Sequence, residues 1–403
     1  MGRVLHLINT AGPGGAETVY LNIVDSLDRE TWESVAVVPE MDWLTRRLTA
    51  LGHAPILETC HGLLDFRYWL RLAQLIRKES IDVVHAHLFG PALEASLIGV
   101  LTRVPVICTL HGRGDLSPGE RFKSGKFRLI NRGAARVVFV SESLRRYFLE
   151  QGPLRPELTT VIPNGIDLRR FEEPYAGLKR EMGIPEDRFI VGAVGNLRSV
   201  KRYDVLVRAA ARLRAQSPDY FFVIVGDAPA ELHAELMALR DSLGLEDALR
   251  FVGFQEEVEK YLSTFDLFAL SSDSEGFSIA TVQAMAAGLP IVATRCGGPE
   301  EILEHGRTGQ LVPAGDPTAM ADAIESLRGD AAGRASLGHA ARAEVEQRFS
   351  LAAQVASYER LYQVVMRERG RGRAADRSPT GAMQPSGRPV RYRTRPAPAS
   401  ERR

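Results

Sequence analysis

Three segments of this sequence place small or charged residues directly after apolar runs, an arrangement that suits an anionic ligand. The first is GPGGAE at residues 12–17, which follows the apolar run at residues 4–8. Glycines such as Gly15 let backbone amides approach a ligand, and the helix expected from Glu17 onward attracts anions to its N-terminus. A purely steric role for these glycines is the alternative. Because the spacing is not G-x-G-x-x-G, a nicotinamide-dependent dehydrogenase is disfavoured.

The second segment carries cations. The residues VGNLRSVK at positions 194–201 leave an apolar run and place Arg198 and Lys201 just beyond it. Cations at the carboxyl end of the first parallel strand of a domain suit a diphosphate. A solvated basic loop explains this segment equally well when it is considered alone.

The third segment, SEGFSIATVQAMAAGLP at residues 274–290, is the most informative. Gly276 permits a tight turn, and Ser278 can cap a helix that runs to residue 287. The free backbone amides near the start of that helix, at residues 277–279, could receive phosphate oxygens.

Two polar side chains of the same segment could contact a sugar. Glu275 lies just before the expected helix, and Gln283 lies about two turns into it. Both side chains can accept hydrogen bonds from hydroxyl groups. Glu275 could instead serve only the helix dipole, a role that stabilises a protein by about 0.3–1 kcal/mol.

Histidines end two further apolar runs. His111 ends the run at residues 104–111 and precedes a glycine, so it faces a cleft or is simply a satisfied structural histidine. His85 and His87 lie two residues apart, so on a regular strand they share one face. We expect His87 nearer the ligand because it ends its strand, and we expect His85 to serve the structure.

The elements that must position these residues form two successive series in which apolar runs alternate with amphipathic segments. Such runs predict parallel strands covered by helices on both faces, which is a doubly wound α/β arrangement. The expected strands are residues 4–8, 35–38, 81–87, 104–111 and 135–140, then 189–194, 220–225, 250–253, 267–270 and 290–294. The expected helices are residues 17–27, 67–78 and 92–101, then 204–215, 231–243 and 279–287.

The boundary between the two series lies in a segment rich in proline and glycine, at residues 161–175. We therefore expect one α/β domain over residues 1–168 and a second over residues 169–350, facing each other across a cleft. Residues 351–366 form a last amphipathic helix. The tail at residues 371–403 has nine Arg, two acidic residues and five Pro, and it predicts a disordered basic extension. That tail is a solvated extension or an arm for anionic lipid or nucleic acid.

Composition excludes several classes of protein. The 403 residues include 51 Lys and Arg against 50 Asp and Glu, a formal net charge of +1, so the chain is not a globally basic nucleic-acid binder and we expect no nucleic-acid partner. Three scattered cysteines are too few for a disulfide framework or a zinc cluster. No apolar run approaches the roughly 20 residues of a membrane-spanning helix. We expect a cytoplasmic protein, with membrane contact only at its surface on the cytoplasmic face.

Taken together and in order, these motifs resemble those of retaining glycosyltransferases of family 4, which have the two-domain GT-B fold. The resemblance covers nearly all of residues 1–370. The matching segments are GGAE at 14–17, DVVHAH at 82–87, TLHG at 109–112, VSES at 140–143, IPNGID at 162–167, residues 275–290, CGGPEE at 296–301 and TGQLVP at 308–313.

The resemblance implies a nucleotide-sugar donor held mainly by the second domain, without a metal or another cofactor. It implies that the last helix crosses back onto the first domain. The implied donor-binding residues are Gly15, Asn164, Asn196, Arg198, Lys201, Gly276, Phe277, Ser278, Ile279 and Gln283. The implied catalytic residues are His111 beside the sugar, Glu275 on its hydroxyls and Lys201 on the diphosphate. His87 and Glu17 are assigned to the acceptor side.

Two positions depart from the family pattern. Gln283 stands where the family usually has a second carboxylate, and Asn196 stands where an Arg usually follows the glycine of the diphosphate loop. Glutamine keeps an acceptor for the ribose and adds donors. Arg198, two residues beyond Asn196, could replace the missing cation.

The acceptor is the least determined part of the prediction. Basic and aromatic residues mix at 66–71 and at 113–136, as in segments that dock an anionic membrane, although a helix with a solvated cationic face has the same composition. We expect transfer to a glycan or lipid-linked acceptor of the cell surface. The alternatives are a small soluble acceptor on the same fold, and a nucleotide-sugar-binding protein with lost or weak catalysis.

Overall fold

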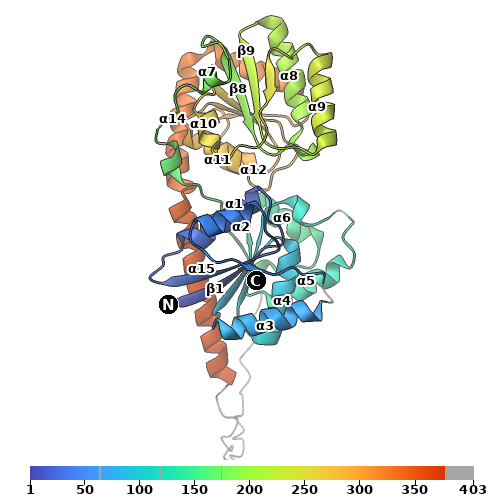
Figure 1. The fold of residues 1–403 in the computed structure, drawn as a ribbon, viewed down its shortest axis with the longest axis vertical. Helices are drawn as coiled ribbons and strands as arrows, with labels where there is room; N and C mark the ends of the chain where they lie inside the picture. The colour runs from blue at the N-terminus through green and yellow to red at the C-terminus, as the bar shows by residue number, and fades with distance from the viewer. Residues whose placement is uncertain (63–64, 118, 174, 377–403) are drawn as a thin grey trace, which may run out of the picture.

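The protein is described here by a computed structural model, which describes residues 1–62, 65–117, 119–173 and 175–376. In these residues the chain forms two α/β domains, one above the other in Figure 1. Each domain has one sheet of parallel strands, with seven strands in the first domain and six in the second. This confirms the predicted pair of doubly wound domains.

The first sheet has the strand order β3-β2-β1-β4-β5-β6-β7. Its central strands are buried along their whole length because helices cover both faces of the sheet. The strands are β1 (Gly2–Leu7), β2 (Trp32–Val38), β3 (Ile56–Leu57), β4 (Val83–His87), β5 (Val106–Leu110), β6 (Arg136–Phe139) and β7 (Thr159–Val161). The helices are α1 (Gly15–Ser26), α2 (Trp43–Ala50), α3 (Phe66–Lys78), α4 (Phe89–Thr102), α5 (Lys123–Gly133) and α6 (Glu142–Gln151), with short 3-10 turns at Arg113–Asp115 and Pro156–Leu158.

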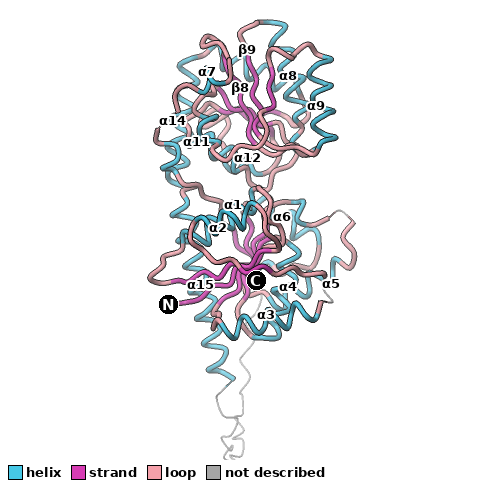
Figure 2. The backbone as a smooth tube through the Cα atoms, viewed as in Figure 1, coloured by secondary structure: helices cyan, strands magenta, loops and turns pink. Residues whose placement is uncertain are grey.

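The second sheet has the order β10-β9-β8-β11-β12-β13. Its strands are β8 (Phe189–Val194), β9 (Tyr220–Val225), β10 (Leu249–Phe251), β11 (Leu267–Leu270), β12 (Ile291–Thr294) and β13 (Gln310–Val312). Its helices are α7 (Leu178–Glu181), α8 (Tyr203–Gln216), α9 (Ala230–Ser242), α10 (Val258–Leu262), α11 (Ile279–Ala286), α12 (Gly298–Ile302), α13 (Pro317–Gly329) and α14 (Ala331–Arg348), with 3-10 turns at Leu168–Phe171 and Ser199–Lys201. Figure 2 shows the strands at the centre of each domain, inside a layer of helices.

The last helix, α15 (Leu351–Asp376), leaves the second domain and runs along the first, as Figure 1 shows. Tyr358, Tyr362 and Val365 pack in one apolar cluster with residues of α1 and of the first sheet. This helix continues ten residues beyond the predicted end at 366. Residues 371–376, which were placed in the predicted tail, thus belong to this helix, and the Arg and Ala among them are good helix formers. The rest of the predicted tail, 377–403, lies outside the described residues.

Two chain segments connect the domains, and they run side by side. The backbone amide of Ile166 donates to the carbonyl of Phe349, and the amide of Leu351 donates to the carbonyl of Ile166, both at 2.9 Å. A Cβ atom at Gly165 would lie 2.4 Å from the Ser350 carbonyl oxygen, so only glycine fits this crossing. Within the described part of the chain, no helix is long and apolar enough to cross a bilayer.

Candidate active site

The carboxyl ends of the two sheets face each other, and the loops that follow the strands touch. A Cβ atom at Gly276 would lie 2.3 Å from the carbonyl oxygen of His111, so the second domain reaches the first only because residue 276 has no side chain. Ser141 Oγ donates a hydrogen bond to the Gly276 carbonyl at 2.5 Å. Asn196 Nδ2 donates to the Pro13 carbonyl at 2.9 Å. The domains are therefore closed on each other at the predicted site.

An ion pair occupies the second-domain side of this site. Lys201 Nζ lies 2.6 Å from Glu275 Oε1, and the two side chains are only 19% and 10% exposed. Ser272, which is fully buried, donates to the same carboxylate oxygen at 2.6 Å. The residues predicted to hold the diphosphate and the sugar are thus in direct contact. A ligand phosphate would give Lys201 a second anionic partner at a position where water is largely excluded.

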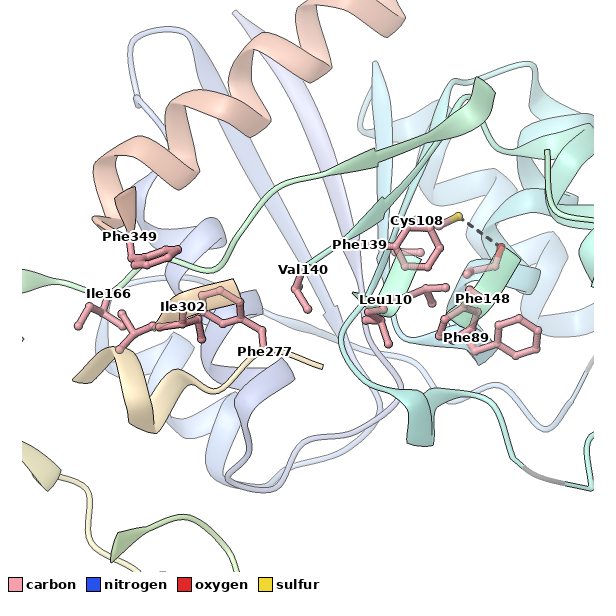
Figure 3. Close-up of a cluster of buried hydrophobic side chains, with 14 of the residues drawn as sticks. Phe89, Cys108, Leu110, Phe139, Val140, Phe148, Ile166, Phe277, Ile302 and Phe349 are labelled. Carbon is pink, nitrogen blue, oxygen red and sulfur yellow. Dashed lines mark hydrogen bonds between the residues drawn. The ribbon is translucent and has the colours of Figure 1, made fainter. Parts of the chain in front are cut away.

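The start of α11 forms the neighbouring wall. Ser278 caps the helix, since its Oγ accepts from the Thr281 amide at 3.3 Å. The Phe277 side chain points away from the site and packs edge-on against Phe349, with ring centroids 5.6 Å apart (Figure 3). A Cβ atom at Gly15 would be 3.5 Å from Ile279 Cδ1, so the glycine loop of the first domain lies against the first residue of α11. Figure 3 also shows Ile302 and Ile166 in the same cluster of buried apolar side chains.

The first-domain side is built on histidines. His87 Nδ1 and His111 Nε2 are 3.0 Å apart, and the two rings stack with centroids 5.2 Å apart. Burial lowers the pKa of His111 to about 3 and holds the pKa of His87 well below its usual range, so both rings are neutral. His87 is fully buried beside His111, and its assignment to the acceptor side stays a prediction.

Asp115 fixes the backbone at His111. Its Oδ2 accepts from the His111 amide at 2.7 Å, and burial together with the charge of Glu17 raises the pKa of Asp115 to about 6. Glu17, predicted on the acceptor side, therefore lies close enough to act on this carboxyl group. Asp115 was not among the predicted site residues, because nothing in its local sequence signals burial.

His85 serves the structure, as expected. Its Nδ1 is 2.8 Å from the Tyr362 hydroxyl of α15, and its Nε2 is 2.8 Å from Thr109 Oγ1. Among the described residues, His6, His85 and His87 form a group whose ligand atoms could surround a metal ion. Because both ring nitrogens of His85 already have partners in the protein, this group is better suited to packing than to metal binding.

Three other predicted residues divide into two kinds. In the described part of the chain, neither Arg198, which is exposed, nor Gln283, which is partly buried, has a side-chain hydrogen bond or an ion pair, so both are available to a ligand. Asn164, in contrast, is buried at the domain crossing, where its Oδ1 accepts from Gln354 Nε2 at 3.2 Å. The Oδ1 atom of Asn164 thus already has a partner on α15, and its predicted donor contact stays a prediction.

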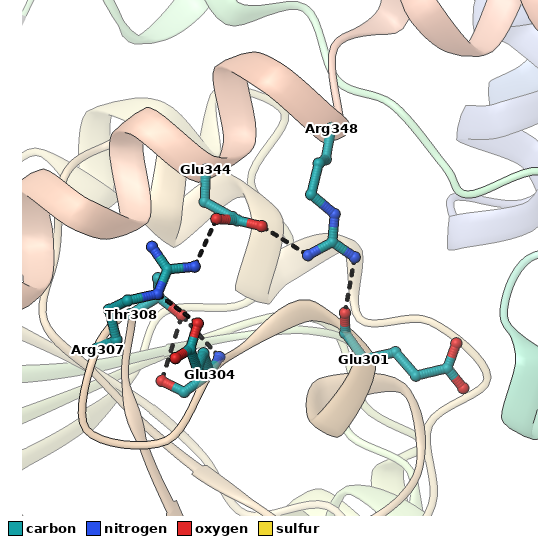
Figure 4. Close-up of polar contacts among 6 residues, drawn as sticks. All are labelled: Glu301, Glu304, Arg307, Thr308, Glu344 and Arg348. Carbon is teal, nitrogen blue, oxygen red and sulfur yellow. Dashed lines mark hydrogen bonds and ion pairs between the residues drawn. The ribbon is translucent and has the colours of Figure 1, made fainter.

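Glu301 is a residue whose place the sequence did not reveal. Its carboxylate, from the second domain, accepts from the amides of Glu142 and Ser143 at the start of α6, at 2.8 and 2.5 Å. An anion at a helix N-terminus is stabilised by the helix dipole. The Glu301 carbonyl in turn accepts from Arg348 Nη2 at 3.1 Å, which ties it to the Arg348–Glu344–Arg307 ion-pair chain (Figure 4). Glu301 therefore joins the second domain to the first through two hydrogen bonds, while Arg348 holds the backbone of Glu301 in place.

Comparisons with known proteins agree with this architecture. Residues 13–170 match the family model described as Glycosyltransferase Family 4, and residues 177–344 match the one described as Glycosyl transferases group 1. The chain is 32% identical over 312 residues to N-acetyl-alpha-D-glucosaminyl L-malate synthase of Bacillus anthracis, covering 75% of this chain and 80% of the relative. It is 29% identical to D-inositol 3-phosphate glycosyltransferase of Pseudarthrobacter chlorophenolicus, covering 64% of this chain and 65% of the relative.

Among solved structures, HepE of Anabaena in complex with UDP-glucose superposes with a TM-score of 0.78 at 25% identity. The match covers 93% of this chain and 99% of that protein.

Proposed function

Since this chain belongs to glycosyltransferase family 4 and is a retaining glycosyltransferase, we propose that it transfers a sugar from a UDP-sugar to a small soluble acceptor. The observation that carries the donor half of the proposal is the contact between Lys201 and Glu275, with Nζ and Oε1 2.6 Å apart, beside the capped start of α11. The UDP-glucose complex of the similar HepE protein supports UDP as the nucleotide.

In the proposed reaction the leaving diphosphate gains negative charge as the bond to the sugar breaks. Lys201 and the free amides at the start of α11 stabilise that charge in a site that excludes water. Glu275 accepts hydrogen bonds from the sugar hydroxyls and orients the sugar. His111, which is neutral, faces the sugar from the first domain and adds a hydrogen bond without adding a charge.

Arg198 replaces the cation that Asn196 lacks. Asn196 is engaged with Pro13, whereas the guanidinium of Arg198 is exposed and available. Replacing Arg198 by Ala should weaken UDP binding about threefold to tenfold, the loss of one charge-assisted hydrogen bond at an exposed site. Unchanged UDP affinity in this variant would contradict the assignment.

The small acceptor is supported by the relatives. The names of the N-acetyl-alpha-D-glucosaminyl L-malate synthase and of the D-inositol 3-phosphate glycosyltransferase both refer to compact, water-soluble molecules, L-malate and inositol 3-phosphate.

The proposal can be tested by measuring thermal stabilisation and sugar release with UDP-, GDP- and ADP-sugars. We expect stabilisation by a UDP-sugar and slow hydrolysis that is lost in Glu275→Ala. The matched control is Glu235→Ala, which changes an exposed glutamate of α9 in the same domain. Stabilisation by GDP- or ADP-sugars alone would contradict the choice of nucleotide. Binding with no release, even when small soluble acceptors are added, would favour a binding protein.

A second candidate acceptor, a glycan or lipid-linked molecule at an anionic membrane, has its own observation. Phe66, Leu70 and Phe122 of the first domain are 60–82% exposed, beside the basic residues Arg67 and Lys123. Exposed apolar side chains next to cations suit an anionic bilayer. Flotation with liposomes that shows no dependence on anionic lipid would remove this candidate.

A further inference from the structure

A hollow of about 530 Å³ lies between the domains, beside the candidate active site. Arg113, Arg146 and Tyr147 line it from the first domain, and Arg295 and Gly297 line it from the second. It shares a wall with the sugar-orienting loop, because the Glu275 amide donates to the Cys296 carbonyl at 3.1 Å and the Gly298 amide donates to the Glu275 carbonyl at 3.0 Å. The hollow is therefore directly behind the backbone that carries Glu275.

Two of the three arginines around this hollow have no ion-pair partner among the described residues. Within the described residues, Arg113 and Arg146 have no carboxylate partner, and Arg295 reaches only Glu300, at 4.0 Å. The Arg113 guanidinium lies over the Tyr147 ring, 5.1 Å from its centroid, which limits its orientations.

Three carboxylates also line the hollow, and two of them have partners in the protein. Asp273 is paired with Arg202 at 2.8 Å, and Glu300 accepts from the Gly297 amide at 2.9 Å. Glu150 is the remaining acidic residue of the lining. The two first-domain guanidinium groups, of Arg113 and Arg146, are therefore available to an anion, and Arg295 faces them with only the 4.0 Å contact to Glu300.

We infer that this hollow binds an anionic group of the acceptor, a carboxylate or a phosphate. The inference rests on the proposed function and specifies its substrate class. Guanidinium groups match the geometry of both anions and can donate two parallel hydrogen bonds. Arg113 is two residues from His111, and Gly297 lies beside Glu275, so an anion held here keeps the rest of the acceptor next to the donor sugar.

The site is complete only in the closed molecule. Arg113 and Arg146 come from the first domain and Arg295 from the second, so an anion bound between them favours closure. An acceptor with this group would thereby help to exclude water before transfer.

Calorimetry with the full chain in the presence of UDP tests the inference. The probes are L-malate and glycerol 3-phosphate, with L-malamide and glycerol as their neutral counterparts. We expect at least one anion to bind, and its neutral counterpart to bind at least tenfold more weakly. Arg113→Gln and Arg146→Gln should each reduce the affinity for that anion about tenfold or more, and added salt should weaken it.

The matched control is Arg212→Gln, the same substitution at an exposed arginine of α8 that does not line the hollow; it should leave anion affinity unchanged. Thermal melting of each variant identifies a loss of folding. The affinity for UDP should stay within about twofold in all three variants, so a defect of the donor site is distinguished from a defect of this hollow.

Three results would overturn the inference. The first is anion binding that does not depend on Arg113 or Arg146. The second is a parallel loss of UDP affinity, which would assign the arginines to the donor. The third is binding of inorganic phosphate alone, with neither organic anion bound. In a separate arm, sedimentation with phosphatidylglycerol vesicles that requires Arg146 would support the same chemistry with a lipid headgroup as its source.

Discussion

The two sides of the active site hold polar groups in different ways. The first domain presents stacked imidazoles, His87 and His111, that burial keeps neutral. The second domain presents a charged pair, Lys201 and Glu275, in which each group offsets the other. Burying a neutral polar ring costs less than burying a lone charge. The first domain can therefore close tightly over a donor, while the second supplies the charge that the leaving group requires.

The largest effect on activity is expected from removing the charge of Lys201 in the second domain. Lys201→Met should reduce the rate of donor turnover at least 100-fold, because it removes a cation from the developing diphosphate charge. The double variant Lys201→Met with Glu275→Gln should fall little further, since the two groups act as a unit. Steady-state kinetics of the single and double variants measure this. Strictly additive losses would mean that the pair is not a functional unit.

A buried histidine of the first domain, His6, predicts how the stability of the protein depends on pH. Burial lowers the pKa of His6 to about 3, against 6.5 for an exposed histidine. As the pH falls from 7 to 5, the unfolded chain takes up a proton that the folded protein cannot, so the free energy of unfolding falls by about 2 kcal/mol for this histidine. His6→Phe should lose about that much less stability over this interval in denaturant titrations.

The control for this prediction is His339→Phe, the same substitution at an exposed position of α14. If the free energy of unfolding of His6→Phe depends on pH in the same way as that of the wild type, then His6 is protonated, or open to water, in the folded protein.

A smaller effect is expected at the ring that faces the cleft. His111→Ala should lower kcat/KM about threefold to tenfold, the value of one hydrogen bond between neutral groups. The pH profile of kcat/KM for the wild type should show no inflection from His87 or His111 between pH 6.5 and 8, because burial lowers the pKa of both rings. Activity should fall below about pH 6, where Asp115 takes up a proton and binds the His111 amide less well. Asp115→Asn should flatten that acid limb, and an acid limb that persists would assign it to another group.

The smallest effect concerns the contact between the two sides. Asn196→Ala removes the hydrogen bond to the Pro13 carbonyl, which joins the diphosphate loop to the glycine loop. We expect a twofold to threefold rise in the KM for the donor, with kcat nearly unchanged, because one part-buried hydrogen bond between neutral groups contributes little. A large loss of kcat would indicate that this contact controls closure itself.

Much of the fold followed from local pattern. The predicted strands at 189–194, 220–225 and 267–270 coincide with β8, β9 and β11, because continuous apolar runs bounded by polar residues leave little choice. The three-residue strands β7 and β13 were not predicted, since so short a segment has no readable period. Helix α14 was also missed, because its apolar residues form a weak stripe among charged ones.

Some residues of the candidate site could also be predicted from the sequence, and others could not. Ser278 as the cap of α11, and Gly276 as a residue without a side chain, were readable from the turn chemistry of a few neighbouring residues. Ser272, Asp115 and Glu301 were not, because their roles depend on partners brought near by folding.

By itself the sequence determined the two α/β domains, the order of their elements and the residue types at the ends of the strands. Those features depend on residues within one or two turns of each other. Only the tertiary structure decided that Lys201 pairs with Glu275, 74 residues away, that the histidines lose their charge, and that arginines from both domains surround one hollow. Pairing and burial depend on distant segments packing together, which no local pattern records.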